Sequence, residues 1–429
     1  MKKMFLALCA VGLLLAGCTT PKDDDATTTT ANDDPPSTEL GVGVTDDTIK
    51  VGVTYSDLSA IKDIVNIDHG DYLSAFRALA DDINANGGIN GRTIEIVDGP
   101  VDPVGTDSAT TVCTALTEDE QVFAVLGNVQ ADVTSCYVTD HETALVGGQM
   151  TAETVAAATA PWFAYDATLD FTAEQTVKGA LADGQLDGAT VGIVGLPVHD
   201  ALIADTLVPM LEDAGVDVAT EVVLDAPPDD QAAADAQALT FAERFRADGV
   251  DTVITVGDAF LVFTRVLPQT QFRPELVATD RNVVETYLVG RSDFAAFEGG
   301  VVVGGPAPSD IGWTAAPMQD CIDRILAVDP DRQIDDPIGA TADTPNTWVS
   351  VTVACQAMTL FHAIAEKAGD TLNNDTFRAA GDDLGEIEIP GKGGPSTYSA
   401  EVPSGNPPVF LATWDAGSEA FVTQPEPVS

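Results

Sequence analysis

The sequence predicts an α/β protein of two Rossmann-like lobes, each with a parallel sheet covered by helices. Short apolar stretches alternate with amphipathic ones along most of the chain, a pattern typical of parallel sheets with helices on both faces. This alternation runs through two successive series. The chain of 429 residues is also longer than one hydrophobic core usually supports. Together these observations favour two lobes over one.

The first series opens with TIKVGVTY, an apolar run at residues 48–55 that predicts a buried strand. The next segment, residues 71–88, predicts a helix that Asn86-Gly87-Gly88 end. Its apolar stripe has spacings of four, three and four and consists of Tyr72, Phe76, Leu79 and Ile83. Further strands are predicted in RTIEIVDG, QVFAVLGN and TALVGG, and a helix is predicted at residues 107–116.

The second series repeats this alternation. Strands are predicted in ATVGIVGL, VDVATEVVL, VDTVITVG and ELVATD, with helices at residues 200–214, 231–247 and 259–267. Beyond the strand-like GGVVVGGPAP the pattern is less regular. There we expect helices at residues 315–328, 347–368 and 375–384, and one more strand in PPVFLATWD.

The N-terminus predicts export. Lys2 and Lys3 precede an apolar run, residues 4–16, that is too short to span a bilayer and has the anatomy of a secretory signal peptide. Leu15-Ala16-Gly17-Cys18 resembles a bacterial lipobox, in which Cys18 takes a diacylglycerol and becomes the first residue of the mature lipoprotein. The alternative is an ordinary signal peptide with a Cys near its end. We therefore expect a signal peptide at residues 1–17 and a membrane-anchored protein outside the cytoplasm.

The segment after the lipobox predicts a tether. Residues 18–47 are rich in Asp, Thr and Pro and have few large apolar side chains. Such a composition cannot bury enough surface to fold, and repulsion between its Asp side chains keeps it extended. We expect a disordered acidic tether over this range.

The charge balance excludes some classes of partner. The chain has 19 Lys and Arg against 68 Asp and Glu, a formal net charge of -49. Nucleic acid and anionic lipid headgroups are bound by clustered cations, so neither is an expected partner. The acids are scattered along the chain, which indicates a soluble surface rather than an acidic site.

The cysteines also indicate an exported protein. One of the six lies in the signal peptide and Cys18 takes the lipid, which leaves Cys113, Cys136, Cys321 and Cys355. An even number is typical of disulfides in an oxidising compartment. Three pairings are possible, and proximity in sequence favours Cys113 with Cys136 and Cys321 with Cys355. Metal binding is the alternative, but no CxxC pair and no His cluster favours it.

Several stretches carry a family resemblance. They are GVTDDTIKVGVTY, then ALADDINANGGINGRTIEIVDGPVDP, whose INANGGING turn spans residues 83–91, and FAVLG. Together they resemble the leucine/isoleucine/valine-binding (branched-chain amino acid) family of type I periplasmic binding proteins, in a lipoprotein form. PWFAYD and the later strands extend the resemblance, more weakly, to about residue 425. It implies two lobes on a three-crossing hinge, with lobe 1 at 48–165 and 302–389 and lobe 2 at 166–301 and 390–429.

The resemblance implies a function in solute uptake. Such a protein closes on an amino acid or a related small polar solute and delivers it to an ABC transporter in the membrane. Two alternatives stay open: a ligand-sensing lipoprotein that signals through a partner, and a lipid-anchored enzyme on the same scaffold. The sequence contains no phosphate-binding loop, no nucleophile elbow and no HExxH motif, and its four His share no ligand spacing. No catalytic residue, cofactor or metal is therefore predicted.

The predicted ligand-binding residues lie in the loops that follow the strands, because ligands of open α/β sheets bind beyond the carboxyl ends of the strands. In lobe 1 they are Ser56, Asp57, Gln130, Gln149, Met150 and Thr151. In lobe 2 they are His199, Asp258, Phe260 and Asp280. The resemblance implies that Thr151 contacts the α-carboxylate of an amino acid and that Asp280 contacts its α-ammonium.

Some of these residues depart from the family pattern. Val198-His199 and Asp258-Ala259-Phe260 stand where that family commonly has aromatic clamps, which argues against an aliphatic amino acid. Gln130 and Gln149 would suit an amide-like ligand. The sequence leaves a second role open for three residues: His199 could begin a helix in solvent, Asp280 could form a turn, and Phe260 could belong to the core.

Overall fold

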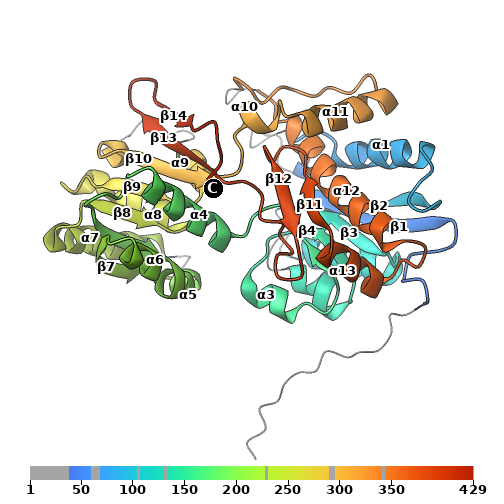
Figure 1. Cartoon of the computed structure of the whole chain (residues 1–429), viewed down its shortest axis with the longest axis horizontal. Coiled ribbons are helices and arrows are strands. Elements are labelled where there is room, and N and C mark those ends of the chain that lie inside the picture. Colours follow the sequence, from blue (N-terminus) through green and yellow to red (C-terminus); the bar gives the residue numbers. More distant parts are fainter. Residues whose placement is uncertain are drawn as a thin grey trace, which may run out of the picture. The chain divides into compact units, whose positions relative to one another are not determined.

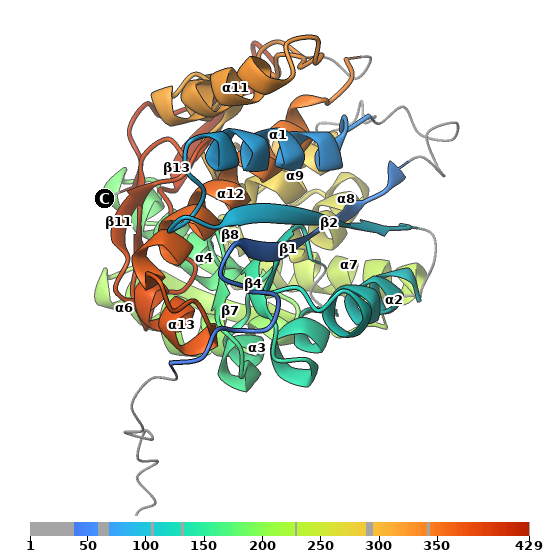
Figure 2. The ribbon, with the colours of Figure 1, turned by 90° about the vertical axis from the view of Figure 1, so that its right-hand side faces the viewer.

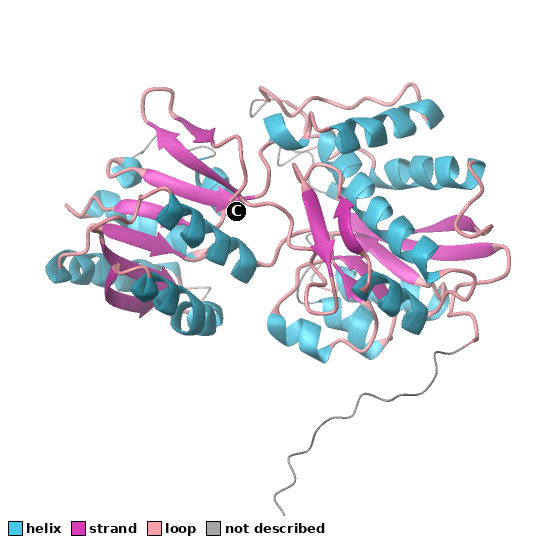
Figure 3. Cartoon of the chain, in the orientation of Figure 1, coloured by secondary structure: helices cyan, strands magenta, loops and turns pink. Residues whose placement is uncertain are grey.

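The computed structural model contains two main sheets, with helices on both faces of each, and a small hairpin (Figures 1 and 3). It describes residues 38–58, 68–103, 107–129, 133–227, 230–288, 295–340 and 344–428. The predicted signal peptide, Cys18 and Gln130 lie outside these residues. Because the predicted alternation folds into two parallel-dominated sheets, the α/β class is confirmed.

The first sheet has five strands in the order β2-β1-β3-β4-β5, all parallel. Their bounds are β1 (Thr48–Ser56), β2 (Thr93–Val101), β3 (Ala124–Gly127), β4 (Ala144–Gly147) and β5 (Trp162–Phe163). The central strands are apolar on both faces, and Val51, Val53 and Val125 are fully buried. This burial explains why the strands read as continuous apolar runs.

Helices cover both faces of this sheet, and we call the assembly lobe 1 (Figure 2). One face carries α1 (Tyr72–Ala85), α11 (Ala316–Val328), α12 (Trp348–Ala368) and α13 (Asn374–Asp382). The other carries α2 (Ser108–Thr114), the π-helical turns Ala115–Asp119 and Cys136–Asp140, and α3 (Ala152–Ala157). All four residues of the predicted α1 stripe are buried. Asp71 begins α1 by accepting the Ser74 N–H at 2.9 Å.

The second sheet has seven strands in the order β14-β13-β10-β9-β8-β6-β7. Their bounds are β6 (Thr190–Gly195), β7 (Asp217–Val223), β8 (Thr252–Thr255), β9 (Glu275–Ala278), β10 (Val301–Gly305), β13 (Phe410–Asp415) and β14 (Ala420–Thr423). The strands β6 to β10 are parallel to one another, and β13 and β14 extend the sheet as an antiparallel pair.

Helices also pack on both faces of the second sheet, and we call this assembly lobe 2. One face carries α4 (Leu169–Ala182), α5 (Asp200–Leu202) and α6 (Val208–Asp213). The other carries α7 (Gln231–Asp248), α8 (Ala259–Val266) and α9 (Arg281–Leu288). Gly249 ends α7 in the left-handed conformation, with φ at 80°, as a glycine after the last helical residue allows.

The structure moves two predicted lobe boundaries. β10 pairs with β9, so residues 302–305 belong to the second sheet and not to lobe 1. The segment near residues 390–394 joins two antiparallel strands, β11 (Gly385–Glu388) and β12 (Pro395–Tyr398), and Tyr398 is buried in the core of lobe 1. Both bounds had been implied by the family resemblance. The chain instead leaves for lobe 2 after β12.

The end of the predicted tether is folded. The Gly41 N–H donates to the Leu372 carbonyl at 2.8 Å, and the Lys50 N–H donates to the Gly43 carbonyl at the same distance. Val44 is buried in the core of lobe 1. The predicted tether, residues 18–47, therefore ends too late in the sequence, because its last residues are folded and pair with β1 through a turn.

Both favoured disulfide pairings are present, and both lie in lobe 1. Cys113–Cys136 joins α2 to the π-helical turn that begins at Cys136. Cys321–Cys355 joins α11 to α12. Among the described residues, α12 is the one helix long and apolar enough to cross a membrane, yet most of that stretch is buried inside the fold.

Candidate ligand-binding site

The candidate site consists of the loops at the carboxyl ends of the parallel strands. In lobe 1, β1, β3 and β4 are neighbours, so the loops after Ser56, Gly127 and Gly147 lie at one edge of the sheet. In lobe 2, β6, β8 and β9 place their following loops at one edge in the same way. The predicted ligand-binding residues within the described part of the chain lie in or next to these loops, and the side chain of Phe260 is buried in the core.

The loops that follow β1 and β3 meet at a small pocket. Ser56 and Asn128 line it together with Thr54 and Tyr137, and its volume of about 10 Å³ has room for about one water molecule. The Tyr165 hydroxyl donates to Asn128 Oδ1 at 3.2 Å. The amide N–H groups of Asn128 find no protein partner among the described residues, so this exposed side chain presents hydrogen-bond donors at the edge.

The loop after β4 contains three predicted contacts in different surroundings. Gln149 is exposed and Met150 is buried. Thr151 is exposed, and its hydroxyl accepts the Thr154 N–H at 3.2 Å as the cap of α3. The Thr151 hydroxyl therefore already has a structural role. Of the three residues, Gln149 is the one whose polar side chain has no hydrogen-bond partner among the described residues.

A cluster of aromatic and acidic groups stands at the same edge and was missed from the sequence. The rings of Tyr55 and Tyr72 stack with centroids 5.1 Å apart. The Tyr55 hydroxyl donates to Asp98 Oδ1 at 2.9 Å, and the Tyr72 hydroxyl lies 3.0 Å from His69 Nδ1. Burial raises the pKa of both phenols, so they stay protonated. The apolar pattern of the sequence predicted that Tyr72 belongs to the core. It gave no sign that the Tyr72 ring stacks on Tyr55 or that its hydroxyl lies next to His69.

In lobe 2, His199 is the most enclosed polar residue among the predicted contacts. It is buried, and its Nδ1 accepts the Leu196 N–H at 3.1 Å, so Nε2 bears the proton of the neutral ring. Burial lowers the pKa of His199, although Asp170 and Asp258 act in the opposite direction. The Nε2–H finds no protein partner among the described residues. Beside it, Val198 is 73% exposed, an apolar side chain in open solvent at the edge.

The remaining lobe 2 residues divide into edge and core positions. Asp258 is exposed at the start of α8. The Asp280 carboxylate accepts the N–H groups of Asn282 and Val283 at 2.9 and 3.3 Å. Burial raises the pKa of Asp280, and these hydrogen bonds oppose that change. Phe260 is fully buried and stacks on Phe297, so it is a core side chain in this structure rather than an exposed clamp.

An ion pair that the sequence did not indicate joins the segment after β5 to the loop between β11 and β12. The Lys392 ammonium pairs with the Asp166 carboxylate and lies 5.6 Å from the centroid of the Tyr165 ring. Its side chain is only 5% exposed, whereas that of Asp166 is 61% exposed. The signal in the sequence that could have indicated this ion pair is Lys392 itself, a single cation within a stretch rich in glycine and proline.

Among the described residues, one group of metal-ligating type has its ligand atoms close together: Cys113, Cys136 and His141. The two sulfurs of this group form the Cys113–Cys136 disulfide and are not thiolates.

Comparisons with known proteins agree with this arrangement. The sequence model of a family described as periplasmic binding protein matches residues 48–419. No curated protein matches the sequence. Among solved structures, an ABC transporter substrate-binding protein from Desulfitobacterium hafniense in complex with Leu is 14% identical, with a TM-score of 0.59, and the match covers 88% of this chain and 100% of that one.

Two other solved structures are similar in fold. A fatty acid ABC transporter substrate-binding protein from Thermomonospora curvata is 16% identical, with a TM-score of 0.54 over 90% of this chain and 94% of that one. A solute-binding protein of an ABC transporter from R. palustris, in complex with 4-hydroxybenzoate, is also 16% identical, with a TM-score of 0.55 over 89% and 96%. At these identities the likeness establishes the fold, and the three ligands differ in chemistry.

Proposed function

This chain belongs to the periplasmic binding protein family, and on that premise we propose that it is a lipid-anchored solute-binding protein. It captures an amino acid or an amide-like small polar solute between its lobes and delivers it to an ABC transporter. The observation that carries this proposal is the family match over residues 48–419, which includes both candidate edges and every strand of the two main sheets except β14. Proteins of this family bind solutes outside the cytoplasm.

The polar groups at the two edges support a small polar solute. The Asn128 amide and the His199 Nε2–H are neutral donors without protein partners among the described residues, and each suits a carboxylate or amide oxygen. The exposed carboxylate of Asp258 suits an ammonium or amide N–H. Closure of the hinge would bring donors of one lobe and acceptors of the other onto a single ligand.

The anchor is proposed from the N-terminal sequence. A diacylglycerol on Cys18 would hold the protein at the membrane, and the acidic segment after it would let the folded lobes reach the transporter. Labelling cells with radioactive palmitate tests this directly. We expect label on the wild type and none on Cys18→Ser, and an unlabelled wild type would contradict the anchor.

The capture of a solute is tested by thermal unfolding against a panel of amino acids, primary amides, urea and short carboxylates. A ligand that binds only the folded protein stabilises it by RT ln(1 + [L]/Kd), about 2.7 kcal/mol at a hundredfold excess over Kd. We expect one chemical class to raise the melting temperature, and Asn128→Ala and His199→Leu to reduce that rise. His141→Gln is the matched control, because His141 lies outside both edges. A panel without effect would contradict the proposal, and consumption of a panel compound would indicate an enzyme.

A further inference from the structure

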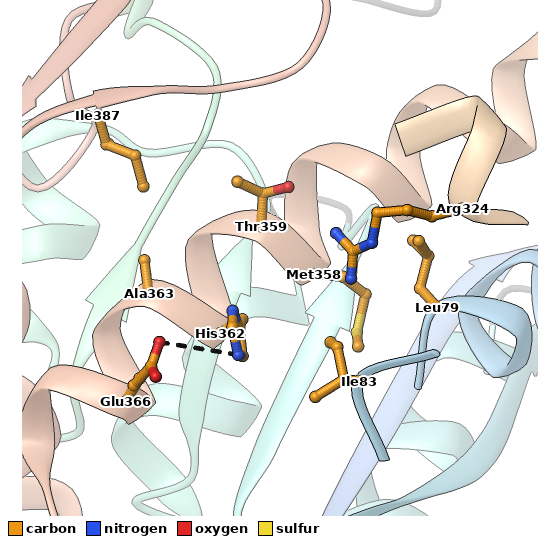
Figure 4. Close-up of a pocket in the computed structure, with 9 residues that line it drawn as sticks. All are labelled: Leu79, Ile83, Arg324, Met358, Thr359, His362, Ala363, Glu366 and Ile387. Carbon is orange, nitrogen blue, oxygen red and sulfur yellow. Dashed lines mark ion pairs between the residues drawn. The ribbon is translucent and has the colours of Figure 1, made fainter. Parts of the chain in front are cut away.

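Lobe 1 has a second pocket, between α1, α11 and α12, that the proposed function does not use (Figure 4). Its volume is about 180 Å³. Leu79, Ile83 and Met358 form its buried apolar lining, and Ile387 of β11 adds to it. The space therefore suits a side chain of a few carbon atoms.

The pocket lies away from the candidate ligand-binding edge. In a βαβ unit the helix runs back from the carboxyl end of one strand to the start of the next, so the last turn of α1, with Ile83, lies toward the amino ends of the strands. Asn90, in the turn that leads to β2, donates to the Glu366 carbonyl at 3.1 Å. The C-terminal end of α12 therefore lies at that far end too.

Two opposite charges stand at this pocket. Arg324 Nε donates to Asp82 Oδ2 at 2.6 Å, and the terminal guanidinium nitrogens find no protein partner among the described residues. Glu366 is 63% exposed and lies 3.8 Å from His362 Nε2, too far for a hydrogen bond. Figure 4 shows Arg324 and Glu366 on opposite sides of His362. A ligand thus meets a cation on one side and an anion on the other.

His362 adds no charge between these two groups at neutral pH. Burial lowers the pKa of its imidazole, with Glu366 and Arg324 acting in opposite directions. A pure anion would meet the nearby carboxylates of Asp82 and Glu366, and a pure cation would meet Arg324. A molecule that carries both charges pairs with both sides and avoids either repulsion.

The walls of the pocket are held in place without a ligand. The Cys321–Cys355 disulfide joins α11 to α12, and it lies one turn before Arg324 on one helix and one turn before Met358 on the other. The ion pair of Arg324 with Asp82 joins α11 to α1. Because three helices are already tied together, binding here requires little ordering of the protein.

We propose that this pocket is a second ligand site, which takes a small zwitterion with a short apolar side chain. The carboxylate of the ligand accepts hydrogen bonds from the Arg324 guanidinium, its ammonium pairs with Glu366, and its side chain contacts Leu79, Ile83 and Met358. The site is separate from the candidate edge and does not depend on the proposed transport function.

Histidine NMR offers a separate signal for each site, because the chain has only four His. The full-length protein is labelled at His Cε1, and the His362 signal is assigned by its loss in His362→Gln. The probe is norvaline, with pentanoate and butylamine as its carboxylate-only and amine-only counterparts. We expect norvaline to shift the His362 signal. Arg324→Gln should weaken norvaline and pentanoate about tenfold and should not weaken butylamine, because it removes a cation that repels the amine. Glu366→Gln should weaken norvaline and butylamine and should not weaken pentanoate.

Two further variants complete the test. Ala363→Leu fills the pocket and should abolish the His362 shift, and Arg77→Gln, an exposed change on α1 outside the pocket, should leave it unchanged. Absence of a His362 shift in the wild type would overturn the proposal, and so would equal losses of all three probes in both charge variants. A His199 signal that fails to move with any panel solute would instead count against the candidate edge.

Discussion

The two lobes share one architecture but hold it together differently. Lobe 1 contains both disulfides, whereas the described part of lobe 2 contains none. Both lobes pack aromatic side chains in their cores. In lobe 2, Phe297 and Trp414 lie 5.1 Å apart and Trp414 and Phe421 lie 5.2 Å apart between ring centroids, and in lobe 1 Phe377 contacts three other Phe rings. From the difference in disulfides we expect reduction to destabilise lobe 1 more than lobe 2.

The candidate edges differ as well. At the edge of lobe 1, polar groups bond to one another, as in Tyr55 with Asp98 and Tyr165 with Asn128. At the edge of lobe 2, Val198 stands in solvent and the His199 Nε2–H has no protein partner among the described residues. A ligand would thus find on lobe 1 a surface whose groups are largely held by one another, with the Asn128 amide N–H groups still available, and on lobe 2 the Nε2–H of His199.

The largest expected effect is on the disulfides of lobe 1. The bridges close loops of 23 and 34 residues, and removal of either, as Cys113→Ser with Cys136→Ser or Cys321→Ser with Cys355→Ser, should cost about 3–4 kcal/mol of unfolding free energy. Hydrogen exchange by mass spectrometry should show faster exchange in β1 and β3 and little change in β8 and β9. Equal acceleration in both lobes would contradict the comparison.

A smaller effect is expected in lobe 2 from Gly304→Ala. A Cβ at this position would lie 1.8 Å from Thr176 Oγ1, so α4 or β10 must shift. Overpacking of this kind costs about 1–3 kcal/mol. Denaturant unfolding should show that loss, and adding Thr176→Ala should recover part of it. No loss in the single variant would mean that α4 packs less tightly on the sheet than the structure indicates.

The pH dependence of lobe 2 stability should report His199. Its pKa is lower in the folded protein than the ordinary 6.5, so as pH falls the unfolded chain takes up this proton first. The folded state therefore loses stability as pH falls below about 6.5 and keeps it above. His199→Gln should flatten this part of the unfolding profile, read from exchange in β6 and β8. A slope that is unchanged in the variant would rule out His199 as its source.

The smallest effect is expected from Lys392→Met, one of two variants that each remove a partner of the Lys392–Asp166 ion pair. Lys392→Met leaves an exposed carboxylate in water and should cost less than about 1 kcal/mol. Asp166→Asn leaves a nearly buried ammonium without its carboxylate and should cost more. Thermal unfolding of the two variants under the same conditions gives the comparison. A reversed order would show that the buried end does not depend on the pair.

Much of the fold could be predicted because local patterns decide it. The α1 stripe of Tyr72, Phe76, Leu79 and Ile83 is buried as its spacing predicts, and the cysteines nearest in sequence are paired. The antiparallel parts were harder. β12 and β14 are short strands, and nothing local says that Tyr398 belongs to the core of lobe 1.

The candidate site was only partly predictable. The positions of loops after strands follow from the parallel sheet, so Ser56 and His199 could be placed at the edges. The direction of each loop side chain could not be predicted from the sequence. An error of one position along a loop is enough to exchange a ligand contact for a core residue. Phe260 and the helix-capping Thr151 show this, and the second pocket depends on three helices far apart in sequence.

The central claim is that one small solute is held by both edges, and calorimetric titration of the best panel compound tests it most directly. The account predicts binding to the wild type that Asn128→Ala in lobe 1 and His199→Leu in lobe 2 each weaken, with His141→Gln unchanged. Binding that is indifferent to the variants of either lobe, or no binding by any compound of the panel, would contradict it.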